Sequence, residues 1–231
     1  MKNAHKDPVQ REYARLAQTY DARWCAYVEA TLEQTLKRIE LHGQERLLDI
    51  GCGTGVLLAA IERRCPDAVL AGVDPTQEML EIATRRLPRK VRTEQSWAEK
   101  LPFEDGAFDV VVSCNMFHYI RQPEVALNEM VRVLKPAGRL VLTDWCRDYW
   151  SCQLLDLFLR LFNKAHFKTY KKEECDKFLS SAGFDGIKID RYKINWFWGM
   201  MTATASKRTV FGADRPAKAL TSAMTLQSQV D

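Results

Sequence analysis

The sequence contains no Cys-x-x-Cys pair, no apolar N-terminal segment of signal-peptide type and no apolar run long enough to cross a bilayer. Its seven cysteines are odd in number and mostly lie inside apolar or motif segments, which indicates reduced thiols rather than a disulfide framework. We therefore expect a cytoplasmic protein, and no cluster of residues suggests a bound metal.

The sequence also lacks an excess of charge of one sign. Its 34 basic and 30 acidic residues occur in mixed order and leave a formal net charge of +4. This balance does not indicate a basic binding surface for nucleic acid or for a strongly anionic membrane. With 46% hydrophobic residues in 231, the chain is long enough to bury one sizeable core, which predicts one domain with short extensions.

Strand-like and helix-like patterns alternate through the middle of the sequence. The expected strands are 46–50, 68–74, 91–95, 108–114 and 139–144, and the expected helices are 56–64, 76–87 and 123–134. Thr76 is expected to cap the second of these helices, and the "KPAG" run at 135–138 is expected to be a turn. Such alternation predicts parallel crossover connections and a doubly wound, Rossmann-like α/β sheet with helices on both faces.

Further segments flank this alternating region. Residues 9–41 predict two helices broken near Tyr20, and later helices are expected at 150–162 and 171–183. "IKIDRYKI" and "WFWGMMTATA" are typical of a final pair of strands. The predicted organisation is N-terminal helices over 1–41, a core over 42–205 and a mobile tail over 206–231.

The stretch "GCGTG" follows the first strand and opens a helix. Glycines at 51, 53 and 55 allow a ligand to approach the backbone closely, and free N–H groups at a helix start favour an anion. The spacing is GxGxG rather than the GxGxxG that is typical of dinucleotide enzymes. Asp74 ends the second strand, where an acid can accept hydrogen bonds from two vicinal ribose hydroxyls. The pattern therefore predicts a nucleoside ligand with an anionic end.

Four motifs in order carry a family resemblance between about Tyr20 and Gly138. They are "LLDIGCGTG", "GVDPTQEMLEIA", "LPFEDGAFDVVVSC" and "ALNEMVRVLKPAGRL". The sequence resembles the class I S-adenosylmethionine-dependent methyltransferases, particularly the small-molecule branch that contains the ubiquinone and menaquinone methyltransferases. The resemblance implies a seven-stranded, mostly parallel sheet whose last strand is antiparallel. It also implies S-adenosylmethionine as methyl donor and S-adenosylhomocysteine as product.

The same resemblance implies which residues hold the donor. The three glycines would face the methionine moiety, Asp74 the ribose, and Pro75 and Met79 the adenine. Tyr20 and Arg23 would help the N-terminal helices to close the site. The implied cofactor-binding residues are Tyr20, Arg23, Asp49, Gly51, Gly53, Gly55, Asp74, Pro75, Met79, Trp97, Ala98, Cys114 and Asn115.

Trp97 departs from the family pattern. Family members usually carry an acid just before "AExLPF", where it contacts the adenine amino group, whereas this sequence has "SWAEKLPF". An indole cannot accept that hydrogen bond. Trp97 can stack on the purine or close the pocket edge, with Ala98 supplying a backbone N–H, or it can belong to the core.

Methyl transfer from a sulfonium needs in-line placement of the nucleophile and, where that nucleophile must lose a proton, a base. Three side chains are candidates for this base, namely His118 after the fourth strand, Asp144 at the end of the fifth, and His166. The alternatives are packing for His118, capping of the next segment for Asp144, and a surface position for His166.

The insertion over residues 145–170 occupies the place where this family usually builds a lid over the acceptor. Its helix is apolar all round, which favours a buried helix, and a lid is the other interpretation. Either way we expect a small, hydrophobic or planar acceptor, such as a quinone-like ring. Arg160, Lys164 and Lys168 flank the apolar residues, so peripheral contact with a membrane surface is a further hypothesis.

Three other classes of function fit the sequence less well and stay open as alternatives. "SCNMFHYI" lacks the proline-rich motif that amino-methylating enzymes of nucleic acids carry after the fourth strand, so we expect no nucleic-acid partner. A nicotinamide-dependent oxidoreductase would share the architecture but not the glycine spacing. A non-catalytic module that binds S-adenosylmethionine or a protein partner would bind the donor without transferring its methyl group.

Overall fold

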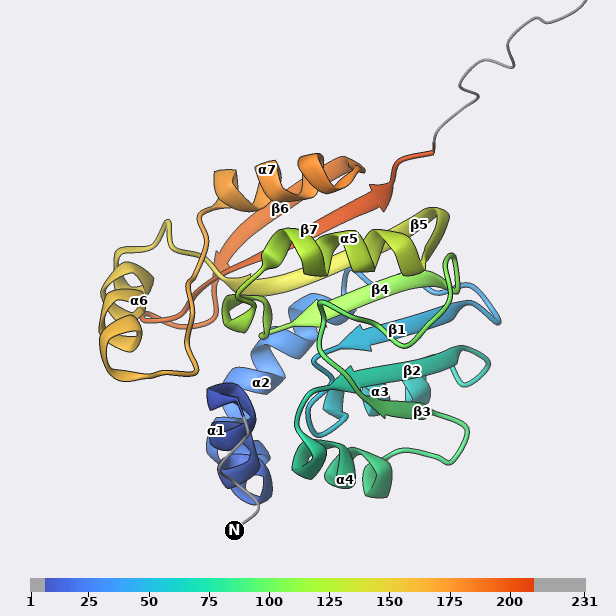
Figure 1. Cartoon of the computed structure of the whole chain (residues 1–231), viewed down its shortest axis with the longest axis horizontal. Helices are drawn as coiled ribbons and strands as arrows, with labels where there is room; N and C mark the ends of the chain where they lie inside the picture. Colours follow the sequence, from blue (N-terminus) through green and yellow to red (C-terminus); the bar gives the residue numbers. More distant parts are fainter. Residues whose placement is uncertain (1–6, 210–231) are drawn as a thin grey trace, which may run out of the picture.

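The computed structural model describes residues 7–209, which form one seven-stranded sheet in the order β3-β2-β1-β4-β5-β7-β6. The strands are β1 (Arg46–Ile50), β2 (Val69–Asp74), β3 (Arg92–Gln95), β4 (Phe108–Cys114), β5 (Leu134–Trp145), β6 (Phe184–Lys193) and β7 (Gly199–Lys207). The first five strands pair in parallel, and β7 runs antiparallel to both β5 and β6 (Figure 1). The predicted α/β fold with an antiparallel last strand is confirmed.

Helices cover both faces of this sheet. The helices of residues 7–209 are α1 (Pro8–Leu16), α2 (Tyr20–Leu36), α3 (Val56–Arg64), α4 (Gln77–Arg86), α5 (Pro123–Val133), α6 (Trp150–Phe162) and α7 (Lys172–Ala182), with 3₁₀ turns η1 (Ala17–Thr19) and η2 (Phe117–Tyr119). One buried core joins the sheet to α5 and α7, and a second joins its opposite face to α2, α3 and α4 (Figure 1). Alternate residues of the central strands enter opposite cores, because successive side chains of a strand point to opposite faces. The chain is therefore doubly wound.

Most predicted elements agree with the structure to within one or two residues, but three expectations need correction. Residues 135–138 are not a free turn, because β5 already begins at Leu134 and bulges there, with Ala137 at a φ of +59°. Thr76 stands at the start of α4, but its side chain makes no capping hydrogen bond. Finally, β7 continues to Lys207 because it pairs with β6, and the predicted tail from residue 210 onward lies outside the described residues.

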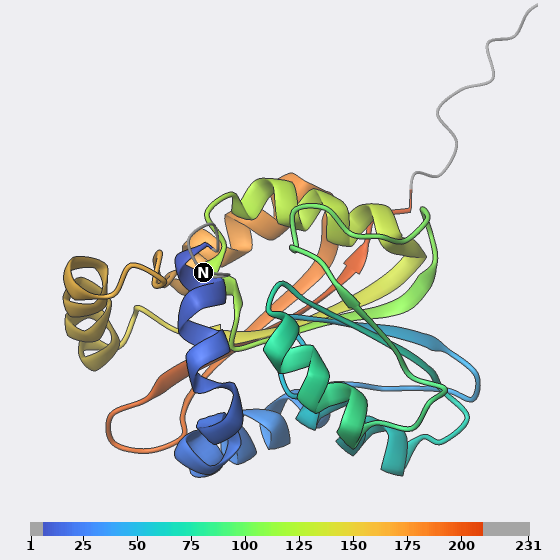
Figure 2. The same ribbon diagram turned by 60° about the horizontal axis from the view of Figure 1, so that its bottom comes forward.

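Helix α6 stands at the side of the molecule, away from the sheet (Figures 1 and 2). Only Ser151, Cys152 and Asp156 are buried, and the large apolar side chains of this helix face solvent. The expectation of a buried helix is therefore wrong, because its polar and sulfur-bearing side, rather than its apolar side, contacts the body. Within residues 7–209, no helix is long and apolar enough to cross a membrane.

Candidate functional site

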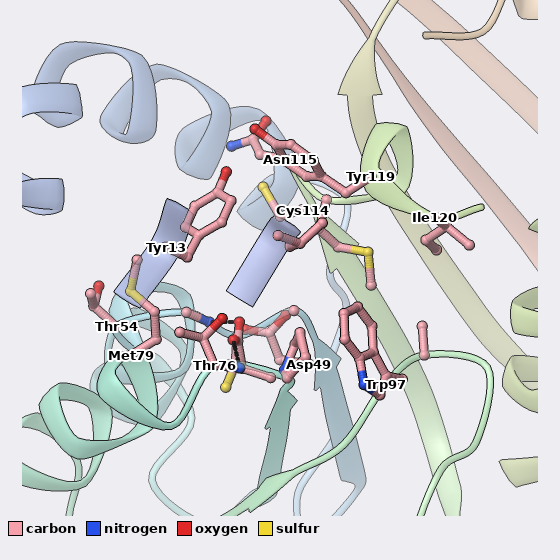
Figure 3. A pocket seen from close by; sticks show the side chains of 18 of the residues that line it. Tyr13, Asp49, Thr54, Thr76, Met79, Trp97, Cys114, Asn115, Tyr119 and Ile120 are labelled. Carbon is pink, nitrogen blue, oxygen red and sulfur yellow. Dashed lines mark hydrogen bonds between the residues drawn. The ribbon is translucent and has the colours of Figure 1, made fainter. Parts of the chain in front are cut away.

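A cavity of about 450 Å³ lies at the carboxyl ends of β1, β2 and β4, beneath α1 and α2. Parallel strands of a doubly wound sheet end at one edge, and β1 and β4 are the neighbours from which the chain winds in opposite directions. Figure 3 shows Tyr13 and Trp97 on opposite sides of the cavity, with Asp49 between them. The predicted residues that line it are Tyr20, Asp49, Gly51, Gly53, Asp74, Pro75, Met79, Trp97, Ala98, Cys114 and Asn115.

The structure requires glycine for a different physical reason at different positions of "GCGTG". Gly51 adopts a φ of +77°, and a Cβ atom there would lie 2.5 Å from Cγ of Met116. Gly53, at a φ of +52°, faces open space in the cavity. Gly55 does not line the cavity, and a Cβ atom there would lie 3.1 Å from Cβ of Ala83 in α4. Gly55 therefore allows the start of α3 to pack closely on α4, which corrects its predicted place beside the methionine moiety.

Asp74 organises the loop that ends β2. Its Oδ2 accepts a hydrogen bond from the Gly53 N–H at 3.0 Å, and its Oδ1 accepts one from the Thr76 N–H at 2.8 Å. Burial raises the pKa of Asp74 to about 6, although these two backbone hydrogen bonds oppose the rise. The Thr76 side chain adds a further hydrogen bond to this carboxyl group, and because Asp74 lines the cavity, its remaining acceptor capacity is available to a ligand hydroxyl.

Asp49 is the second buried acid of the cavity. It is 2% exposed, and in the part of the chain that the structure describes no donor is hydrogen-bonded to its carboxyl group. Burial, followed by the negative charge of Asp74, raises the pKa of Asp49 to about 8. A cationic ligand group would relieve both effects, because it would supply the positive charge that the protein does not.

Trp97 and Ala98 form the opposite edge of the cavity from α1. Trp97 is 38% exposed, whereas Ala98 and Met79 are buried. An indole at the rim offers a flat apolar face to a ring system. Trp97 therefore forms a wall of the cavity and does not belong to the core. Nearby, the backbone carbonyl of Pro75 accepts hydrogen bonds from the side-chain amides of Gln10 and Gln95.

The start of α2 is bound to the glycine loop through Asp21 rather than Arg23. Thr54 donates its hydroxyl to Oδ1 of Asp21 at 2.7 Å, and Arg86 donates to Oδ2 of Asp21 at 2.5 Å and to the Thr54 carbonyl at 2.6 Å. Arg23 is exposed, lies over the Trp24 ring and does not line the cavity. The family resemblance suggested Arg23 beside Tyr20, but Asp21 is the residue that reaches the glycine loop, and α2 is irregular at Trp24, with a φ of −111° and a ψ of 15°.

A hydrogen-bonded chain ties α2 to the ends of β4 and β5. The Trp145 indole donates to the Tyr27 hydroxyl at 2.6 Å, and this hydroxyl donates to Oδ1 of Asn115 at 2.7 Å. The Asn115 amide in turn donates to Thr31 at 2.7 Å. Asn115 has a φ of +59°, a conformation that asparagine tolerates better than most residues, and these bonds hold its side chain at the cavity.

Two tyrosines, Tyr13 and Tyr119, are among the cavity residues that were missed from the sequence. The Tyr13 ring lies 5.8 Å from that of Tyr20 and 5.4 Å from that of Tyr119, in an edge-on contact with the latter. Burial raises the pKa of the Tyr13 and Tyr119 hydroxyls above their usual range. The interval of seven residues between Tyr13 and Tyr20 was an available signal, because that interval corresponds to two helical turns.

The three candidate bases gather in one buried cluster beside the cavity, and none of them lines it. Nδ1 of His118 lies 2.6 Å from Oδ1 of Asp144, and Nε2 of His166 lies 2.9 Å from Oδ1 of Asp156. The two imidazole rings are 5.6 Å apart. Asp144 also accepts the backbone N–H groups of His118 and Trp145, and it does not cap the following helix α6.

Tyr119 separates this cluster from the cavity. Its ring lines the cavity and lies 4.0 Å from the His118 ring. Among the described residues, Nε2 of His118 and Nδ1 of His166 are buried and lack a hydrogen-bond partner. His166 is buried because its bond to Asp156 replaces water, so the expectation of a surface histidine is wrong.

The fold and the cavity define a doubly wound α/β domain with a reversed final strand and a cavity at the carboxyl ends of its parallel strands. Residues 48–142 match the family model described as a methyltransferase domain. This match over 48–142 agrees with the family resemblance that the four ordered motifs predicted, and S-adenosylmethionine is the cofactor that this resemblance implies.

Two curated relatives illustrate the similarity in sequence. The uncharacterized methyltransferase YcgJ of Bacillus subtilis is 36% identical over 142 residues, which are 60% of this chain and 54% of that protein. A demethylmenaquinone methyltransferase of Thermus thermophilus is 39% identical over 129 residues, 54% of this chain and 55% of that protein. The chain thus spans about half the length of these relatives.

Solved structures share the fold. A methyltransferase of Thermotoga maritima dependent on S-adenosylmethionine superposes with a TM-score of 0.72 at 20% identity, covering 87% of this chain and 100% of that chain. A phosphoethanolamine N-methyltransferase of Haemonchus contortus, solved with S-adenosylhomocysteine, gives a TM-score of 0.70 at 17% identity, covering 87% and 60% respectively. These two similarities show that the helices and strands of this chain are arranged as in those structures.

Proposed function

We propose that this protein transfers the methyl group of S-adenosylmethionine to a small apolar or aromatic acceptor. The observation that carries the proposal is the pair of buried acids in one cavity, with Asp74 held by the glycine loop and Asp49 without a donor among the described residues. S-adenosylmethionine presents two ribose hydroxyls, an ammonium group and a sulfonium centre. Asp74 would bind the hydroxyls, and Asp49 would face the positive charge.

The same pair of acids argues against a nicotinamide dinucleotide. A pyrophosphate brings negative charge to the glycine loop and supplies no cation to pair with Asp49, which is 2% exposed and has a raised pKa. The close pairing of Gly53 with Asp74 supports a nucleoside at the end of β2. Both observations favour a ligand that is neutral or cationic near Asp49.

For an acceptor that carries a hydroxyl group, His118 is the side chain that we assign as proton acceptor. The acceptor oxygen would attack the methyl carbon, the carbon–sulfur bond would break toward sulfur, and the released proton would pass to Nε2 of His118. Asp144 would hold the other ring nitrogen and stabilise the imidazolium, as an orienting acid does in other His–Asp pairs. Because Tyr119 lies between His118 and the cavity, the acceptor would have to displace that ring.

The preference for an apolar acceptor rests on the walls of the cavity and on one relative. Val28, Leu32, Met116 and Ile120 line the cavity together with the tyrosines. The Thermus thermophilus relative is named for demethylmenaquinone, a substrate with an apolar chain and a planar ring. We therefore expect planar phenols and quinols to be better acceptors than amino acids or nucleic acids.

The test begins with calorimetric titration of S-adenosylhomocysteine and NADH into the purified protein. Binding of the first alone, followed by transfer of labelled methyl to planar phenols, would support the proposal. Equal or tighter binding of NADH would overturn the donor assignment. Binding of S-adenosylhomocysteine without transfer to any member of a broad acceptor panel would favour the non-catalytic module.

A further inference from the structure

One face of α6 exposes large apolar side chains that nothing in the described chain covers. Six of them are between 56% and 72% exposed, and a seventh, Trp196 of the β6–β7 connection, is 78% exposed. The six residues on α6 are Trp150, Leu154, Leu157, Phe158, Leu161 and Phe162. A contiguous exposed surface of this kind marks an interaction site more often than chance scatter does. We call these seven residues the α6 apolar face.

The opposite side of α6 is fixed to the body by specific bonds. Ser151 donates to the Phe197 carbonyl at 2.6 Å, and the Cys152 thiol donates to the Gly199 carbonyl at 3.3 Å. Asp156 accepts the Thr169 N–H at 2.7 Å and binds His166. These contacts hold the helix with its apolar face outward and place it beside the connection that carries Trp196.

The exposed charges of the α6 segment itself are of one sign, although Arg160 lies 3.9 Å from the buried Asp156. Asp156 is the single acid between residues 149 and 170, and it is buried. Arg160 and Lys164 are exposed in the same segment, and Lys168 follows on the loop, where it binds Glu174. An amphipathic helix that combines Trp, Phe and Leu with cations suits the interface of a bilayer that contains anionic lipid.

We propose that the α6 apolar face docks on the surface of an anionic lipid bilayer, with Arg160 and Lys164 at the headgroups. A symmetric second copy fits less well, because an isologous contact would bring the same cations near one another, whereas lipid phosphates would neutralise them. Docking on a bilayer is separate from the methyl-transfer reaction, but it would bring the protein to the phase in which an apolar acceptor dissolves.

The docking surface lies next to the cover of the cavity. Asn163, just after α6, donates to Glu12 of α1 at 3.2 Å, and Tyr13 of the same helix lines the cavity. Figures 1 and 2 both show α6 beside α1. A bilayer bound at α6 would therefore lie close to the helix that closes the site, which gives an acceptor dissolved in lipid a short path.

The test measures co-flotation of the full chain with phosphatidylcholine vesicles, with and without phosphatidylglycerol, in the absence of donor and acceptor. We expect binding to the anionic vesicles, a loss of at least about tenfold in the double variant Leu157→Gln/Phe158→Gln, and a weaker loss in Lys164→Glu. Val125→Gln, which changes an exposed apolar residue of α5, is the matched control and should bind as the unchanged protein does.

Two results would overturn the docking proposal. One is the absence of vesicle binding, or binding that the double variant retains. The other is a dimer in sedimentation experiments that the double variant abolishes while vesicles remain unbound, since the covering partner would then be a second copy. Because no donor or acceptor is present, either result leaves the methyl-transfer proposal to its own experiment.

Discussion

The substitution Asp49→Asn tests the central claim about the cavity, that this acid is held mostly protonated until a cationic ligand arrives. Its pKa is raised from 3.8 to about 8 by burial and by Asp74. The folded protein therefore binds more protons than the unfolded chain between these values, and its stability must fall as the pH rises through this window. The neutral amide that replaces the carboxyl group carries no such proton, so the variant should lack this loss.

The magnitude follows from the pKa difference. One pH unit within this window changes the free energy of unfolding by about 1.4 kcal/mol for each proton, so the stability of the variant relative to the unchanged protein should rise by about 3 kcal/mol from about pH 5 to about pH 7. The amide introduces unpaired donors that cost about 1–3 kcal/mol, but that cost does not vary with pH. In a chain of this size, the melting temperature of the variant should rise by roughly 5–10 °C relative to that of the unchanged protein over this range.

The assay is a series of thermal melts of the unliganded protein over this pH range, with Glu104→Gln as a control that removes an exposed acid. Calorimetry in buffers of different ionisation enthalpy then measures proton release when S-adenosylhomocysteine binds near neutral pH. Release is expected for the unchanged protein, because the ligand ammonium favours ionised Asp49, and its Asp49 component should be lost in Asp49→Asn. Parallel melting of the two proteins across the range would refute the reasoning.

Three further variants separate the roles of neighbouring residues. Asp74→Ala should weaken S-adenosylhomocysteine binding at least about tenfold in calorimetry, since hydrogen bonds to a charged group contribute about 1.5–3 kcal/mol each; unchanged affinity would exclude the ribose assignment. Asp144→Asn should lower turnover and alter its pH profile while leaving donor affinity intact, because His118 loses the acid that orients it; an equal loss of donor affinity would indicate a structural role only. Tyr27→Phe should lower the free energy of unfolding by about 1–3 kcal/mol in denaturant melts, because Asn115 loses its donor, and an unchanged midpoint would show that this bond is dispensable.

Much of the fold could be predicted because its signals are local. The strand "FDVVVSC" and the helix "WSCQLLDLFLRLF" have the bounds read from their apolar patterns, since periodicity and length distinguish the two kinds of element. The bulge at Ala137 was not predicted, because the same Pro and Gly signals indicate a turn or an irregular strand, and pairing with β4 decides between them.

The site was predictable where residues follow directly from strand ends. Gly51, Gly53 and Asp74 reach the cavity because the carboxyl ends of β1 and β2 meet at one edge of the sheet. Gly55 belongs to the same glycine run and Arg23 lies near Tyr20 in the sequence, yet neither residue lines the cavity. Their places depend on which helix packs against them, and spacing along the chain does not contain that information.

By itself, the sequence determined the order of elements, the glycine turn and the acid that follows β2, because these depend on backbone preference and hydrophobic period over a few residues. Only the tertiary structure decided that Asp49 finds no donor among the described residues, that His118 and His166 share one buried cluster, and that α6 turns its apolar side to solvent. Each of these depends on contacts between segments far apart in the chain, where burial and the nearness of charges are set by packing and not by local pattern.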